Sequence, residues 1–181
     1  MTTAQGIPDF AFHLLINEVI KQTIIKTSQQ SLIDALKELT REQILEKKKE
    51  LKKLGLLIGE RVIGYIVKEH IWLKEPNAVL RFVCKEFWLC LFGKYIDRLQ
   101  SNNRGVYIMY DYKFRWLQSL SLDTTDSVDK EAIEKFYNFM LSWVCGVIKG
   151  GLKGLGVSAR SEAKVEEEGC KFTVTLKNMI F

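Results

Sequence analysis

The sequence predicts an α+β fold in which helices pack on one side of a small antiparallel sheet. The 181-residue chain has 47% hydrophobic residues and only 2 Pro and 12 Gly, which favours long regular elements in a single domain spanning residues 1–181. Helical periodicity dominates before Gly105, whereas alternating patterns appear after Gly105 and again after Gly156. Strands and helices do not alternate, which argues against a doubly wound nucleotide-binding fold.

The first elements are expected to be helical. A helix over about 10–26, with Asp9 as its N-cap, is apolar nearly all round and should be buried on two sides, by its own domain and by a partner. An amphipathic helical segment over 31–54 is broken near Thr40.

Glycines punctuate the next helix. Gly55, Gly59 and Gly64 place small residues near one face of an apolar segment that runs to Val67, which favours close approach of another helix backbone. A helix over about 78–100 follows, and its aromatic stripe is expected in the core. The stripe comprises Phe82, Phe87, Trp88, Phe92 and Tyr95.

The C-terminal part changes period and predicts two hairpins separated by a long helix. In chain order, the expected elements are strands over 105–110 and 113–117, a loop over 121–127, a helix from about 129 to 148, and strands over 157–165 and 170–176. The alternation in the last strand predicts a sheet with one buried face.

The charge distribution excludes one class of function and leaves two interpretations of a basic run. A net charge of +5 is moderate, and no aromatic residues interleave with the basic run, so nucleic-acid binding is not expected. That run comprises Lys47, Lys48, Lys49, Lys52 and Lys53. It is either a solvated helix face or a membrane contact that attracts anionic lipid headgroups.

No catalytic, metal or cofactor site is expected. The four cysteines (Cys84, Cys90, Cys145 and Cys170) match no metal-ligand spacing and are interpreted as buried thiols. His13 and His70 lack a nearby nucleophile pattern, which favours structural or surface roles. The glycines over 149–156 close a helix, so they cannot act as a phosphate loop at a helix N-terminus.

The longest apolar stretch also predicts no membrane span. Residues 136–148 form a shorter run than the roughly 20 residues that a bilayer requires. The first residues lack the basic region and apolar core of a signal peptide, so a cytosolic chain is expected.

Several motifs carry a resemblance to a known family. They are Leu80–Trp88, Phe92–Lys94, Ile96–Leu99, Gly105–Tyr107, Phe114–Leu117, Phe139–Gly150, Leu155–Gly156 and Cys170–Val174. Together with Gly55 and Gly59, these runs resemble the small-subunit family of the transport protein particle (TRAPP), and within it the subunit 6 group. The resemblance implies a four-stranded antiparallel sheet with helices on one side.

The resemblance also implies a function. It predicts a non-enzymatic subunit of a vesicle-tethering complex in ER-to-Golgi and Golgi trafficking, at the cytoplasmic face of cis-Golgi and endoplasmic reticulum membranes. Such subunits pair through their first two helices, so the expected partner is subunit 3, within an assembly that promotes nucleotide exchange on a Rab GTPase. Purified alone, the chain is a candidate homodimer. The alternative is an apolar small-ligand or lipid-binding module with a channel in the helical layer.

On this basis, helix one and the helix over 55–67 form the predicted dimerisation face. Its expected residues are Phe12, Leu15, Ile16, Val19, Ile58 and Val62. Two departures from the family pattern matter. The segment 28–53 is longer and more basic, so it is interpreted as an extended or partly flexible helical insertion. The stretch 68–72 contains no cysteine, so the palmitoylation that the resemblance implies for the sister subunit, subunit 3, is not expected in this chain.

Overall fold

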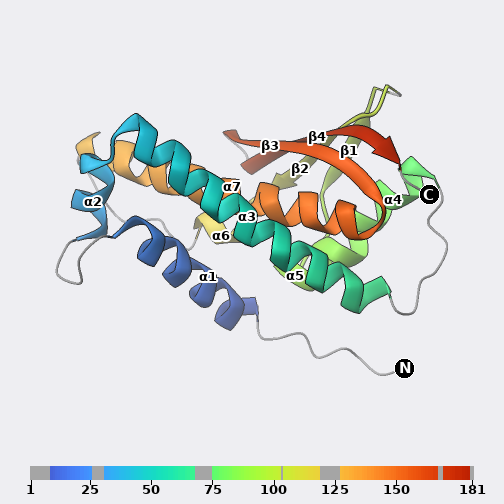
Figure 1. Ribbon diagram of the computed structural model, residues 1–181, viewed down its shortest axis with the longest axis horizontal. Helices are drawn as coiled ribbons and strands as arrows, with labels where there is room; N and C mark the ends of the chain where they lie inside the picture. Colours follow the sequence, from blue (N-terminus) through green and yellow to red (C-terminus); the bar gives the residue numbers. More distant parts are fainter. Residues whose placement is uncertain are drawn as a thin grey trace.

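The computed structural model describes residues 9–25, 31–67, 75–102, 104–118, 127–166 and 169–179 (Figure 1). The helices are α1 (Asp9–Ile24), α2 (Leu32–Glu38), α3 (Arg41–Ile66), α4 (Pro76–Phe82), the π-helix η2 (Val83–Phe87), α5 (Trp88–Phe92), α6 (Arg115–Gln118) and α7 (Ser127–Gly154). The strands are β1 (Arg98–Ser101), β2 (Val106–Tyr112), β3 (Val157–Glu166) and β4 (Gly169–Met179).

The predicted α+β architecture is confirmed. The strands form one antiparallel sheet in the order β1-β2-β4-β3. Helix α7 packs against β3, and alternate residues of that strand (Val157, Ala159 and Ser161) are buried beneath it. The remaining helices lie on the same side of the sheet as α7 (Figure 1). One face of the sheet therefore belongs to the core.

Helices α3 and α7 run parallel and pack backbone against backbone along what we call the glycine seam, formed by Gly55, Gly59, Gly146 and Gly150. A Cβ atom on Gly59 would lie 2.2 Å from the carbonyl oxygen of Val147, and one on Gly150 would lie 2.1 Å from that of Leu56. Only glycine fits at these positions. The predicted close approach is confirmed for Gly55 and Gly59, whereas a Cβ on Gly64 would meet nothing within 4 Å.

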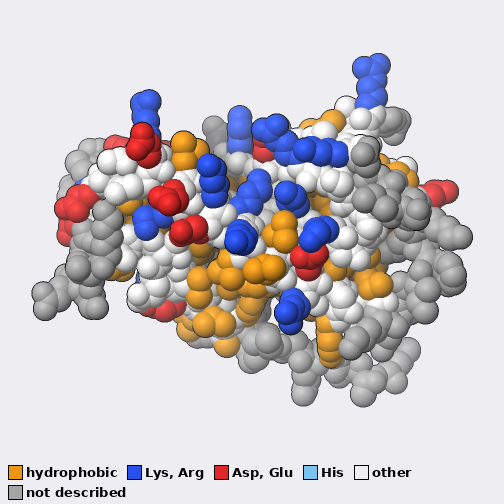
Figure 2. Space-filling model, viewed as in Figure 1, with side chains coloured by type: hydrophobic (Ala, Val, Ile, Leu, Met, Phe, Trp, Pro, Cys, Tyr) orange, Lys and Arg blue, Asp and Glu red, His pale blue; other side chains and the backbone are white. Residues whose placement is uncertain are grey.

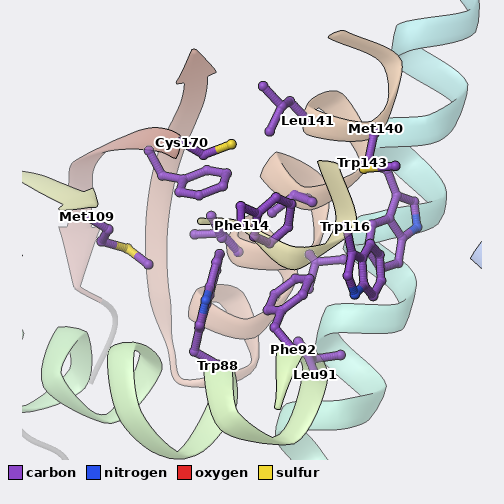
Figure 3. Packing of buried hydrophobic residues seen from close by; sticks show 14 of the residues in the cluster. Trp88, Leu91, Phe92, Met109, Phe114, Trp116, Met140, Leu141, Trp143 and Cys170 are labelled. Carbon is purple, nitrogen blue, oxygen red and sulfur yellow. The ribbon is translucent and has the colours of Figure 1, made fainter. Parts of the chain in front are cut away.

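Aromatic side chains fill the space between the helices and the sheet (Figure 3). Trp88 lies 4.3 Å from Phe92 and 5.2 Å from Phe172, measured between ring centroids, and Trp116 stacks on Trp143 at 5.4 Å. The predicted aromatic stripe is thus in the core. Tyr95, which belonged to that stripe in the prediction, is an exception because half of its surface is exposed.

The first hairpin differs from its prediction. The helix predicted over 78–100 ends at Phe92, because Gly93 adopts a left-handed conformation (φ 69°), and the chain then forms β1. Strand β1 pairs with β2, and the side chain of Asn102 accepts hydrogen bonds from the Arg104 and Val106 amides at the turn. The second strand predicted over 113–117 is wrong, since α6 lies there.

The segment 28–53, predicted as an insertion, is helical where the structure describes it. It forms α2 and the first half of α3. Helix α3 begins with a capping box in which Thr40 and Gln43 exchange side-chain and backbone hydrogen bonds, and it continues without a break through the glycine seam. Leu36 and Leu51 are buried. Residues 26–30, 68–74 and 119–126 lie outside the described residues, so His70, the stretch 68–72 and most of the predicted loop are not placed.

Candidate partner-binding surfaces

Helix α1 buries one face and exposes the other. Ile16, Ile20 and Ile24 belong to the core, and His13 and Asn17 are buried beside them, where the Asn17 amide nitrogen lies 2.9 Å from His13 Nε2. His13 is therefore part of the packing beneath α1, as expected for a structural histidine. The opposite face carries Leu14 and Leu15, which are 50% and 60% exposed. Large apolar side chains with this exposure are typical of a surface that a partner covers.

The residues predicted for the dimerisation face fall into three groups. Leu15 is exposed, whereas Val19, Ile58 and Val62 are half-buried. Phe12 is half-buried and its ring packs against Trp116 at 5.7 Å and Trp143 at 6.1 Å. Ile16 is only 2% exposed. Its assignment to the surface is corrected to the core, because the helix turns it toward the interior.

Other exposed apolar residues were not predicted. Leu14 lies on α1, and Leu57 and Tyr65, 52% and 72% exposed, lie on α3. We call the set Leu14, Leu15, Val19, Leu57, Ile58, Val62 and Tyr65 the α1/α3 surface. Figure 2 shows hydrophobic side chains gathered over α1 and towards α3. A signal for Leu57 existed in the sequence, because the glycine seam occupies one side of α3 and the leucine lies well away from it.

The lysines of the basic run do not share one face. Lys47 Nζ donates to the carbonyl oxygen of Thr23 on α1, and Lys52 Nζ donates to that of Ser161 on β3 at 2.9 Å. Lys48 is half-buried, and burial lowers its pKa. Lys49 and Lys53, four residues apart, remain exposed. Two of the five lysines thus hold neighbouring elements, and the candidate membrane contact reduces chiefly to Lys49 and Lys53.

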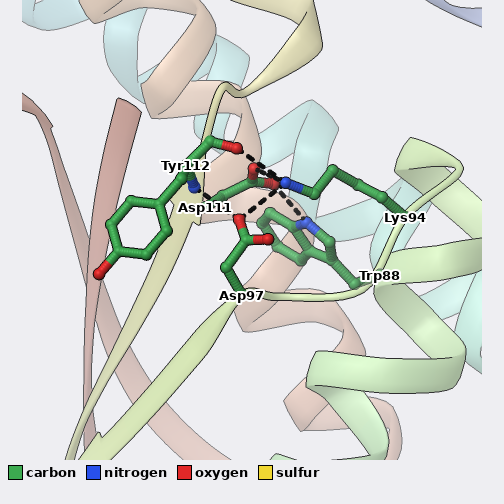
Figure 4. A network of polar contacts seen from close by, with 5 residues as sticks. All are labelled: Trp88, Lys94, Asp97, Asp111 and Tyr112. Carbon is green, nitrogen blue, oxygen red and sulfur yellow. Dashed lines mark hydrogen bonds and ion pairs between the residues drawn. The ribbon is translucent and has the colours of Figure 1, made fainter. Parts of the chain in front are cut away.

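A polar network joins the ends of α5, β1 and β2 (Figure 4). Lys94 Nζ donates to Asp111 Oδ1 at 2.6 Å and to Asp97 Oδ2 at 2.8 Å, and Trp88 Nε1 donates to Asp111 Oδ2 at 2.8 Å. Asp111 is fully buried, and burial raises the pKa of its carboxyl although the Lys94 and Trp88 hydrogen bonds oppose this. With every donor directed at neighbouring elements, the network acts as a tie between the helical layer and the sheet.

The cysteines are free thiols with little nucleophilic character. Burial raises the pKa of Cys84 and of Cys170 to about 12 and that of Cys145 to about 11, so these groups stay protonated at neutral pH. Cys90 is exposed, which corrects its assignment as a buried thiol. Among the described residues, no group of His, Cys, Asp or Glu could hold a metal ion. Within the same ranges, no helix is long and apolar enough to cross a membrane.

Comparison with known proteins identifies the family. Residues 12–177 match the family of transport protein particle (TRAPP) components, so the chain belongs to the TRAPP component family. It is 28% identical over 172 residues to trafficking protein particle complex subunit 6B of Bos taurus, covering 94% of this chain and 99% of that protein. It is 34% identical over 131 residues to subunit 6b of Danio rerio, covering 72% of this chain and 79% of that protein.

A solved structure supports the fold. The crystal structure of a trafficking protein particle complex subunit 3 from Naegleria fowleri, covalently bound to palmitic acid, covers 96% of this chain and 95% of its own with a TM-score of 0.63. Its sequence identity is 13%, so the likeness concerns the fold alone. Family membership gives the chain a role in a trafficking complex, with other TRAPP subunits as partners.

Proposed function

We propose that this chain is a non-enzymatic subunit that pairs with the sister subunit 3 through the α1/α3 surface. The observation that carries the proposal is the exposure of Leu14, Leu15, Leu57 and Tyr65 on two helices that contact each other. The other exposed large apolar residues of the described ranges are Leu45, Leu89, Tyr95 and Val165, which are not part of this surface. Obligate interfaces commonly bury about 2,000 Å² or more, which requires large apolar side chains on each partner.

Substitution of exposed residues tests this surface. In a chain co-expressed with subunit 3, Leu15→Asp and Leu57→Asp should abolish co-elution in size-exclusion chromatography, because each places a charge in an apolar interface. The matched control is Leu89→Asp on α5, which is exposed but lies outside the α1/α3 surface. Retained co-elution of the Leu15 and Leu57 variants, or its loss in the control, would overturn the assignment. The same variants, followed by sedimentation of the chain alone, test whether a homodimer uses this surface.

The wider role follows from the pairing. We propose that the assembled complex tethers vesicles in ER-to-Golgi and Golgi trafficking, at the cytoplasmic side of cis-Golgi and endoplasmic reticulum membranes, and promotes nucleotide exchange on a Rab GTPase. This chain then contributes by holding subunit 3 in place. Exchange assays with the complex reconstituted from wild-type chain or from Leu15→Asp should show lower activity for the variant at equal concentrations of the other subunits.

Exposed lysines of α3 are the candidate membrane contact. Lys49→Glu with Lys53→Glu should weaken flotation of the complex with vesicles that contain phosphatidylserine, whereas Lys47→Glu should not act through lipid because Lys47 is bonded to Thr23. Equal flotation of the double variant and the wild type would contradict the membrane contact and would favour the interpretation of these lysines as a solvated helix face.

The second candidate function is an apolar lipid-binding module. The palmitic acid in the Naegleria fowleri structure favours it. The aromatic rings that fill the centre of this fold oppose it (Figure 3). The raised pKa values of the buried cysteines also oppose covalent acylation. Mass spectrometry of the chain purified from eukaryotic cells should show no palmitoyl adduct and no extracted fatty acid. Detection of a palmitoyl adduct or of a co-purified fatty acid would favour the lipid-binding alternative.

A further inference from the structure

A cavity of about 520 Å³ lies between the α4–η2 helices and the first strands, away from the α1/α3 surface. It is lined by Asn77, Arg81, Cys84, Lys85, Ile96, Leu99, Ser101 and Tyr107. This volume is within the range of ligand sites, about 300–1,000 Å³. None of the functional surfaces described above uses it.

The π-helix shapes one wall of this cavity. Helix η2 contains Cys84 and Lys85, and the carbonyl oxygen of Cys84 accepts a hydrogen bond from the Ile96 amide at 2.9 Å. This bond fixes the segment that leads into β1. At the other end, the Tyr107 hydroxyl donates to Asn77 Oδ1 at 2.8 Å and ties β2 to α4. The walls are therefore held from both ends, and single-turn π-helices are frequent at functional sites.

The cavity combines an apolar floor with a basic rim. Ile96 and Leu99 are half-buried, and the Cys84 thiol stays neutral because burial raises its pKa to about 12. Arg81 and Lys85, four residues apart on one helical wall, are exposed, and neither forms an ion pair within the described ranges. The rim thus favours an anionic group beside an apolar one.

Strand β1 adds a backbone element to the site. It lies at the edge of the sheet, next to β2 alone. The Asn102 amide donates to the Val106 carbonyl oxygen. Because backbone groups alternate in direction along a strand, the even-numbered residues of β1 direct their amides and carbonyls to β2. The amide and carbonyl of Leu99 therefore point away from β2, toward the open edge of the sheet. The side chain of Leu99 lines the cavity at the same time. A strand added at this edge would carry alternate side chains into the cavity.

We propose that this site binds a short acidic peptide segment of a partner protein, which adds as a strand to β1, inserts one apolar side chain between η2 and β1, and places its carboxylates near Arg81 and Lys85. The open edge favours a peptide over a small anion, because a small anion would need the cavity and its rim but not the outward backbone groups of Leu99.

The test uses the full chain, labelled with ¹⁵N, and the peptide acetyl-Gly-Glu-Thr-Leu-Thr-Glu-Gly-amide, in which the leucine and both glutamates lie on one face of an extended strand. At about 1 mM peptide, the amide signals of Leu99 and Lys85 should shift. A peptide with lysine in place of each acidic residue should bind at least about tenfold more weakly. N-methylation of alternate residues, which removes strand donors from the peptide, should abolish binding.

Protein variants complete the test. Arg81→Glu with Lys85→Glu should weaken binding of the acidic peptide by about tenfold or more, and the matched control, Lys49→Glu with Lys53→Glu, should change it less than about twofold. Both pairs are at exposed positions, so both variants should keep the fold. Absence of shifts, equal affinity for both peptides, or indifference to the Arg81 and Lys85 changes would overturn the proposal. If octanoate shifts the same signals and N-methylation of the peptide has no effect on binding, the site binds small anions. That result would also overturn the proposal.

Discussion

The glycine seam and helix α1 pack against the same core in opposite ways. Along the seam, α3 and α7 touch through their backbones, with a Cβ on Gly55 excluded by the Trp143 carbonyl oxygen at 2.2 Å. Helix α1 instead contacts the core through side chains and leaves Leu14 and Leu15 exposed. Beneath α1, Asn17 Oδ1 and Trp143 Nε1 have no hydrogen-bond partner among the described residues. The seam is complete within one chain, whereas α1 leaves an apolar face that we propose a partner covers.

The largest expected effect separates two neighbours on α1. Ile16→Asp should destabilise the isolated chain by about 4 kcal/mol or more, because it puts a carboxylate in an apolar core. Leu15→Asp should change the free energy of unfolding by about 0.5 kcal/mol or less, since Leu15 is exposed. Urea unfolding followed by circular dichroism measures both. Equal losses for the two variants would contradict the division of α1 into a core face and a partner face.

The next effect separates two glycines on α3. Gly59→Ala should cost about 3 kcal/mol, because the new methyl group overlaps the α7 backbone, which cannot move as a side chain does. Gly64→Ala should stabilise the chain by up to about 1 kcal/mol, because its site is open and alanine favours the helix. Thermal unfolding of both variants provides the measurement. A tolerated Gly59→Ala would show that the seam is looser than its backbone contacts indicate.

Hydrogen exchange should show a smaller difference between the two regions. The amides of α1 should open with a free energy about 2 kcal/mol below those of α3 and α7 at the seam, because α1 leaves apolar surface exposed and polar groups unpaired. Binding of subunit 3 should slow exchange in α1 and leave the seam unchanged. Mass spectrometry of peptides from α1 and α7 reports both values, and uniform exchange across them would remove the contrast.

Cysteine alkylation should give the smallest effect. At pH 7.5 iodoacetamide should modify Cys90 in the native chain, slowly, because desolvation raises the pKa of this exposed thiol. Cys145, buried beside the seam on α7, should react only after unfolding. Peptide mapping identifies the modified residue. Rapid native modification of Cys145 would indicate that α7 opens more readily than the seam allows.

Local pattern predicted the elements where one signal was strong. The helical face of α1, the glycine spacing of α3 and the alternation in β4 each follow from a period along the chain. The stretch 93–100 was predicted wrongly as helix, since only the left-handed Gly93 and pairing with β2 make it a turn and a strand. Strand formation there depends on a neighbour that local periodicity does not reveal.

The candidate surfaces show the same division. Sequence alone indicated that α1 has more apolar residues than one core needs, and that five lysines cluster at the start of α3. It could not tell that Ile16 points inward while Leu15 points outward, or that Lys47 and Lys52 bond to Thr23 and Ser161. Each of those facts depends on which neighbour lies against a given helix face.

The chain's own residues were enough to establish its class, its helical content and its family, because these depend on composition and on periods and motifs within single segments. The tertiary structure alone decided which apolar residues stay exposed and where the cavity at β1 forms. Exposure and cavities are properties of the space between segments distant in sequence. That space exists only after α3 has met α7 at the glycine seam and β1 has paired with β2.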